Sequence, residues 1–76
     1  MNKKEEKKEK FRQISEKRVN SILQKLKILG NLSNKSNYNY EKEDVTKIFL
    51  AIEKATKEVR DHFLNKEKKD SFQFKW

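Results

Sequence analysis

Two stretches of helical periodicity, separated by a short polar connector, most constrain the fold of this chain. In residues 11–29 the apolar side chains recur three to five residues apart, and in residues 42–65 they recur mostly three or four apart. At about 100° per residue, each set falls on one face of a helix. Residues 30–41 hold the only glycine and several Asn and Ser residues, which favour turns. The pattern predicts an all-α fold, an antiparallel helical hairpin with one connector.

Local signals mark the ends of both predicted helices. We expect the first helix to stop at Gly30, which can adopt the left-handed cap conformation. Glu41, Glu43 and Asp44 place negative charge at the start of the second helix, where the helix dipole favours it. The hairpin therefore occupies residues 11–65.

Both ends of the chain are predicted to be flexible and basic. Residues 1–10 contain no apolar side chain after the initial methionine, and we expect a charged extension that frays or adds one exposed turn. Residues 66–76 form a basic tail in which Phe72, Phe74 and Trp76 lie two apart. That spacing points the three rings to one side of an extended segment. They either pack on the hairpin or bind a partner.

The predicted core is small for a chain of 76 residues, of which 33% are hydrophobic and 42% charged. Two apolar stripes can fill one seam, and small domains bury a small fraction of their surface. A lone hairpin is therefore marginally stable. The tail can add a third layer, two copies can form a four-helix bundle, or a partner can complete the fold. We favour a homodimer or a partner over a lone monomer.

The charge of the chain points to an anionic partner. The formal net charge is +8, and residues 1–30 carry ten Lys or Arg against four Glu. Such an excess suits nucleic acid or an acidic protein surface. The alternative is that the lysines only solvate the helices.

Composition argues against catalysis and against tightly bound cofactors. The chain has no cysteine, one histidine and one glycine, which rules out metal sites built from spaced Cys and His and rules out glycine-rich phosphate loops. His62 is expected at the surface or at the edge of the second helix's apolar stripe. We predict a protein that is not an enzyme and has no cofactor. No apolar run is long enough for a signal peptide or a membrane span, so we expect a soluble cytoplasmic protein without membrane contact.

The central part of the chain resembles short helical proteins encoded on plasmids, phages and other mobile elements of low-GC bacteria. The resemblance rests on Arg18 and Asn20, the turn in residues 30–34, the Ser-Asn-Tyr-x-Tyr connector in residues 36–40, and the Asp-Val-x-Lys-Ile-Phe sequence in residues 44–49. It covers about two thirds of the chain. It implies a mobile-element context and carries no activity.

Arg18 is the most informative single residue, because it falls within the apolar stripe of the first helix. A charge in that position needs a partner. We expect Arg18 to contact Glu53 of the second helix, with Thr56 adding a hydrogen bond. The alternative is that Arg18 binds an anion.

The candidate contact residues are the basic side chains of the first helix, the polar and aromatic side chains of the connector, and the aromatic side chains of the tail. Lysine and arginine would bind phosphates, tyrosine would stack on bases, and asparagine would read base edges. The candidates are Lys10, Arg12, Lys17, Arg18, Lys35, Asn37, Tyr38, Tyr40, Phe72, Phe74 and Trp76.

These features support three functional hypotheses. The first is a small basic protein that binds nucleic-acid phosphates and acts on the nucleic-acid machinery of a mobile element. The second is a protein-binding regulator or inhibitor, either anti-CRISPR-like or antitoxin-like, whose partner is a nucleic-acid-handling protein. The third is a structural homodimer without a ligand.

Overall fold

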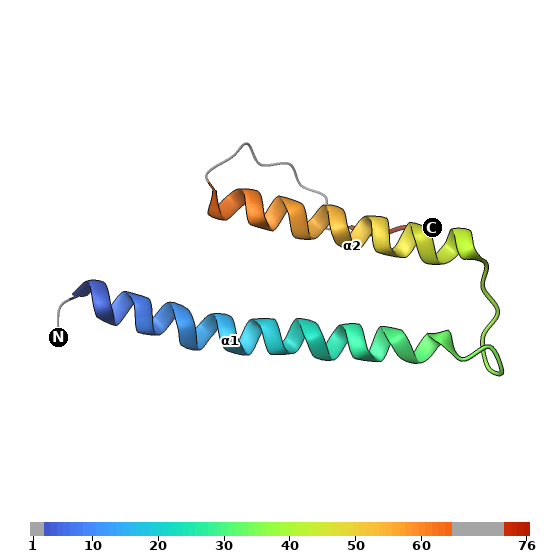
Figure 1. The fold of residues 1–76 in the computed structure, drawn as a ribbon, viewed down its shortest axis with the longest axis horizontal. Helices are drawn as coiled ribbons and strands as arrows, with labels where there is room; N and C mark the ends of the chain where they lie inside the picture. The colour runs from blue at the N-terminus through green and yellow to red at the C-terminus, as the bar shows by residue number, and fades with distance from the viewer. Residues whose placement is uncertain (1–2, 65–72) are drawn as a thin grey trace. The chain divides into compact units, whose positions relative to one another are not determined.

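The computed structural model describes residues 3–64 and 73–76. All regular secondary structure in that part of the chain is helical. Helix α1 spans Lys3–Gly30, a 3-10 turn follows at Asn31–Ser33, and helix α2 spans Lys42–Phe63 (Figure 1). These are the two helices and the connector of a helical hairpin, so the predicted fold class is confirmed. The chain divides into two units, Met1–Tyr38 and Asn39–Trp76, whose relative position is not determined. Which helix faces meet, and whether two copies associate, therefore stay predictions.

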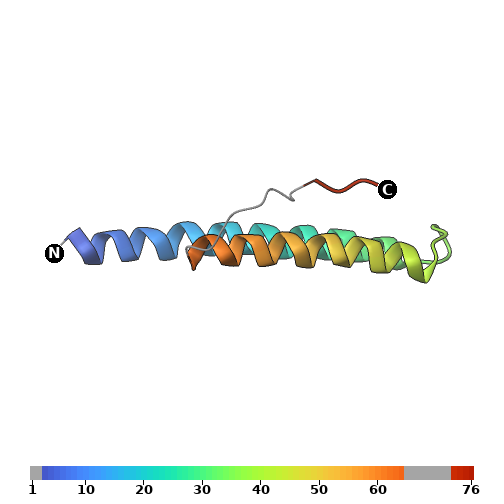
Figure 2. The ribbon, with the colours of Figure 1, turned by 90° about the horizontal axis from the view of Figure 1, so that it is seen from above.

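Helix α1 begins at Lys3, well before Phe11, where the apolar pattern starts. Lysine and glutamate are good helix formers, so a segment without apolar residues can extend the helix. Glu5 and Glu6 lie in the first turn, where negative charge suits the helix dipole. Residues 3–10, predicted to fray or to add one exposed turn, are thus the first turns of one unbroken helix (Figure 2).

The conformation predicted for Gly30 is wrong. Its φ and ψ angles are −59° and −25°, which are right-handed helical values, and the chain continues directly into the 3-10 turn. The backbone becomes extended only at Asn34, where φ is −70° and ψ is 103°. The α-helix thus ends at Gly30 as predicted, and the 3-10 turn continues the helical backbone to Ser33 before it becomes extended.

Replacing Gly30 with alanine is expected to stabilise the chain by about 0.5–1 kcal/mol, because alanine loses less backbone entropy in a helical conformation. A Cβ atom at this position would meet no other atom within 4 Å. Thermal unfolding followed by circular dichroism at 222 nm measures the change, and a gain of 1 kcal/mol corresponds to a rise of about 4–8 °C in Tm. A lower Tm would indicate the left-handed cap instead.

The connector closes into a tight turn after the 3-10 helix. The Asn34 carbonyl accepts hydrogen bonds from the backbone N–H groups of Asn37 and Tyr38, at 3.1 and 3.0 Å. The Asn34 side-chain Oδ1 also accepts one from the Ser36 N–H, at 2.9 Å. Asparagine forms such side-chain turns readily. The prediction of turn structure in this polar segment is confirmed.

Helix α2 is stabilised near both of its ends. Asp44, in the first turn, accepts a hydrogen bond from the Glu41 N–H at 2.9 Å, which satisfies a backbone donor just outside the helix. Near the other end, Lys57 Nζ lies 3.4 Å from Asp61 Oδ2, one turn along the helix. The Leu64 N–H then donates to the carbonyl of Arg60 at 3.1 Å. The helix ends at Phe63, close to the predicted boundary.

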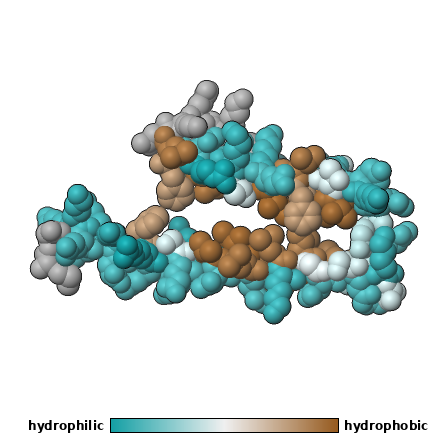
Figure 3. Space-filling model, viewed as in Figure 1, coloured by the Kyte–Doolittle hydropathy of each residue, from teal (hydrophilic) through white to brown (hydrophobic). Residues whose placement is uncertain are grey.

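Apolar side chains gather on both helices, whereas the first turns of α1 are polar (Figure 3). No apolar residue among those that the structure describes is fully buried. On α2 the partly buried apolar residues follow one line along the helix: Ile48, Ala51, Ile52 and Ala55. A single chain therefore leaves much of its apolar surface open to water, as the small predicted core implies.

Candidate nucleic-acid interface

A row of exposed lysines runs along one side of α1. Lys3, Lys10 and Lys17 recur every seven residues, and Lys7 and Lys25 lie close to the same line. At 100° per residue, the five lysines fall within an arc of about 80°. At 1.5 Å per residue, they extend over about 33 Å. These five residues are called the lysine ridge.

Negative charge is concentrated on the other side of the same helix. Glu5, Glu9 and Glu16 fall within an arc of about 40°, and its centre lies about 140° from the centre of the ridge. One of these carboxylates, Glu9 Oε1, accepts a hydrogen bond from Gln13 Nε2 at 3.3 Å. Glu6 alone borders the ridge. Helix α1 thus has a cationic side and an anionic side.

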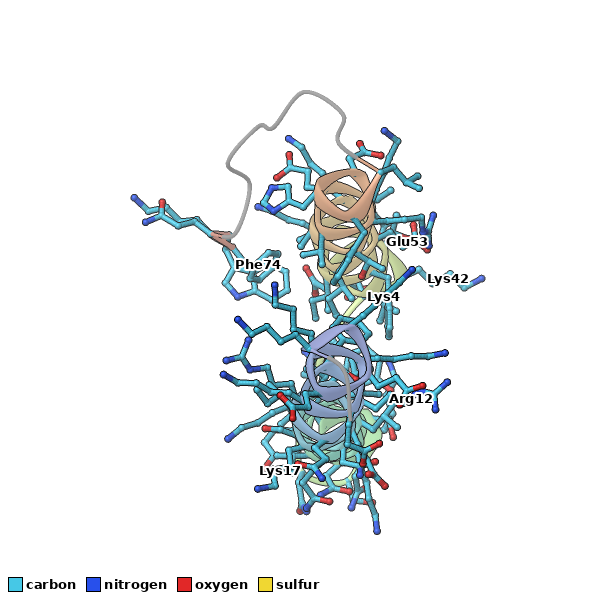
Figure 4. The ribbon with its side chains drawn as sticks, turned by 90° about the vertical axis from the view of Figure 1, so that its left-hand side faces the viewer. Lys4, Arg12, Lys17, Lys42, Glu53 and Phe74 are labelled. Carbon is cyan, nitrogen blue, oxygen red and sulfur yellow. The ribbon has the colours of Figure 1, made fainter. Side chains whose placement is uncertain are left out.

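The structure brings two of the predicted α1 contacts together and separates a third from them. Lys10 and Lys17 both belong to the ridge, about 10 Å apart along the helix axis. Arg12 lies on the glutamate side, and Figure 4 shows Arg12 and Lys17 projecting from different sides of α1. Arg12 therefore does not share a face of α1 with Lys10 and Lys17, and its predicted contact stays a prediction. Helical geometry alone separates them, because residues five apart point in different directions.

Arg18 is exposed and lies within the apolar stripe of α1, on the side of the stripe that borders the ridge. Its predicted contact with Glu53 would join the two units of the chain and stays a prediction. The Thr56 hydroxyl donates to the Ile52 carbonyl of its own helix at 2.8 Å, and its oxygen can still accept from a guanidinium N–H, so the added hydrogen bond also stays a prediction.

The connector candidates divide between the two units. Lys35, Asn37 and Tyr38 lie in the turn that follows Asn34, and all three side chains are exposed. Tyr40 belongs to the second unit and is half-buried. The backbone N–H groups of Asn37 and Tyr38 are used within the turn, so only their side chains remain for a ligand.

The aromatic tail is partly described. Phe74 and Trp76 lie with their ring centroids 5.2 Å apart and their planes at 72°, an edge-to-face pair. The predicted arrangement on one side of the segment is confirmed for these two rings. The ammonium group of Lys47, on α2, lies 5.6 Å from the centroid of the Trp76 ring. Phe72 lies outside the described residues.

Glu58 is the one buried polar residue among those described, with 8% of its surface exposed. Its Oε2 atom has no hydrogen-bond partner. A buried carboxylate oxygen that no donor reaches destabilises a fold, because it has lost its hydrogen bonds to water without forming new ones. His62, one turn further on α2, is exposed as expected.

Sequence reasoning missed several residues that the structure places in or near these sites: Lys3, Lys7, Lys25, Lys47 and Glu58. The seven-residue recurrence of lysine was present in the sequence, but the first ten residues were not expected to continue the helix. Glu58 follows Ala51 and Ala55 on one side of α2. Such small side chains are a weak signal of close packing.

The chain matches no family model, no curated protein and no solved structure. The resemblance to mobile-element proteins therefore stays a prediction. In the part of the chain that the structure describes, no helix combines the length and apolar character needed to cross a bilayer. The same residues include no cluster of three His or carboxylate side chains that could hold a metal ion.

Proposed function

We propose that this chain is a small, non-enzymatic nucleic-acid-binding protein that acts on the nucleic-acid machinery of a mobile element. The observation that carries the proposal is the lysine ridge of α1, which is exposed and separated from the helix's main cluster of carboxylates. Lysine ammonium groups spaced along a rod bind a phosphate backbone without regard to base sequence. Arg18, at the edge of the ridge, adds a guanidinium group that suits phosphate geometry.

The affinity of the chain for nucleic acid is expected to fall steeply with salt, because phosphate contacts release counterions. If each ridge lysine makes one phosphate contact, raising monovalent salt from 50 to 200 mM lowers the affinity by about 100- to 500-fold. Fluorescence anisotropy of a labelled oligonucleotide measures this dependence. An affinity that hardly changes over that range would contradict the proposal.

A protein-binding regulator or inhibitor, anti-CRISPR-like or antitoxin-like, is the second candidate, and a structural homodimer without a ligand is the third. Two observations favour a protein partner: the described residues include no fully buried apolar side chain, and Glu58 Oε2 has no hydrogen-bond donor. A partner with an apolar face and a basic side chain would satisfy both. Nuclease treatment during a pull-down separates the first two candidates, since only a protein complex survives it.

A further inference from the structure

The two described aromatic rings of the tail form an exposed pair. An edge-to-face contact at 5.2 Å is favourable, so the rings support each other. Yet 67% of Trp76 and 45% of Phe74 remain exposed. Exposing this much aromatic surface to water is unfavourable. Grouped exposed apolar side chains mark a binding site more often than single scattered ones do.

Positive charge lies beside this pair. Lys47 holds its ammonium group 5.6 Å from the Trp76 ring centroid, a cation–π distance that ties the tail to α2. Lys75 lies between the two aromatic residues in sequence and is exposed. Aromatic rings with ammonium groups beside them are the chemistry that single-stranded nucleic acid needs, since bases stack on rings while phosphates contact cations.

We propose that Phe74 and Trp76, with Lys47 beside them, form a stacking site for unpaired bases of single-stranded nucleic acid. This inference rests on the proposed function and specifies its ligand. The bases of a duplex are already stacked on each other and are not free to stack on a side chain. The site therefore favours a single strand over a duplex of the same length, and it tolerates any base sequence, because every base has a π-face.

Trp76 is the only tryptophan, so the intrinsic fluorescence of the protein reports directly on this ring. The probes are a thymidine oligomer of about 12 nucleotides, a length within the range for one small binding module, and a duplex of equal length. We expect the thymidine oligomer to quench tryptophan emission and the duplex to leave it nearly unchanged. Anisotropy of the same labelled probes measures binding independently of the tryptophan.

Substitutions then assign the effect to the ring. Trp76→Ala is expected to weaken binding of the thymidine oligomer by about 5- to 150-fold, the range for loss of one base–aromatic stack. Trp76→Phe should restore most of the affinity, because phenylalanine still stacks. Gln73→Ala, in the same segment, should bind as the unaltered chain does. Circular dichroism verifies that each variant keeps its helices.

The outcomes separate this inference from the proposed function. Oligomer binding without quenching, or with full affinity in Trp76→Ala, overturns the stacking site and leaves phosphate binding by the ridge in place. If Trp76→Ala weakens oligomer binding while a variant with Lys10 and Lys17 both replaced by glutamine keeps full affinity, the stacking site is supported and the role of the ridge is overturned. Absence of any binding to either probe overturns both.

Discussion

Replacing Lys10 and Lys17 together with glutamine is expected to weaken nucleic-acid binding by about 25-fold for a single strand and about 60-fold for a duplex at 0.1 M salt, because each lost phosphate contact costs about fivefold or eightfold at that concentration. The slope of log affinity against log salt should also become shallower, by close to one unit for each lysine. Glutamine is a good helix former, so α1 keeps its structure. Fluorescence anisotropy across a salt series measures both quantities.

The control for this experiment lies on the same helix. Arg12→Gln combined with Lys27→Gln removes the same net charge from the glutamate side of α1. At physiological salt the Debye length is about 8 Å, so charges on the far side of a helix are largely screened from a ligand on the ridge. The control should therefore change the affinity by about twofold or less. Equal weakening by the two double variants would show that net charge, and not the ridge, governs binding.

Replacing Glu58 with leucine is expected to stabilise the chain by about 1–3 kcal/mol. The side chain is 8% exposed and its Oε2 has no donor, so its removal eliminates an uncompensated desolvation cost. Leucine has a similar volume and adds apolar contact in the same place. Chemical denaturation followed by circular dichroism measures the free energy of unfolding.

Glu16→Leu is the matched control, because it removes the same charge from an exposed position in the middle of a helix, α1. That substitution should change the free energy of unfolding by about 0.5 kcal/mol or less, as exposed positions usually do. Glu58→Gln, which keeps the shape, should fall between the two. A loss of stability in both Glu58 variants would mean that the carboxylate has a stabilising partner.

The sequence predicts the helical elements well where apolar periodicity carries the signal, and poorly where it does not. The strong apolar stripe of α2 places that helix between Lys42 and Phe63, close to the expected bounds. Residues 3–10 contain no apolar side chain, so apolar periodicity cannot predict a helix there. Their lysine–glutamate composition and the acidic first turn support the helix instead.

The candidate site is predicted only in part, because two of its features are not local in sequence. The contact of Lys47 with Trp76 joins positions that nothing in the sequence pattern connects. The burial of Glu58 depends on what packs over α2, and a glutamate among lysines reads as a surface residue. At Gly30 the general preference of glycine for left-handed caps led to a wrong prediction. The backbone there is right-handed helical, and alanine could occupy the same position.

The seven-residue recurrence in the lysine ridge has a geometric consequence for the ligand. Seven residues fall about 20° short of two full turns of an α-helix, so Lys3, Lys10 and Lys17 shift by only about 40° in all, and Lys7 and Lys25 lie together at the other edge of the same arc. The row therefore stays within a narrow band that runs nearly parallel to the axis of α1. A straight duplex, whose persistence length is about 50 nm, can lie along such a band without bending, and so can a single strand. Phosphate contacts on the ridge alone therefore do not choose between the two, and that choice falls to the stacking of bases on Phe74 and Trp76.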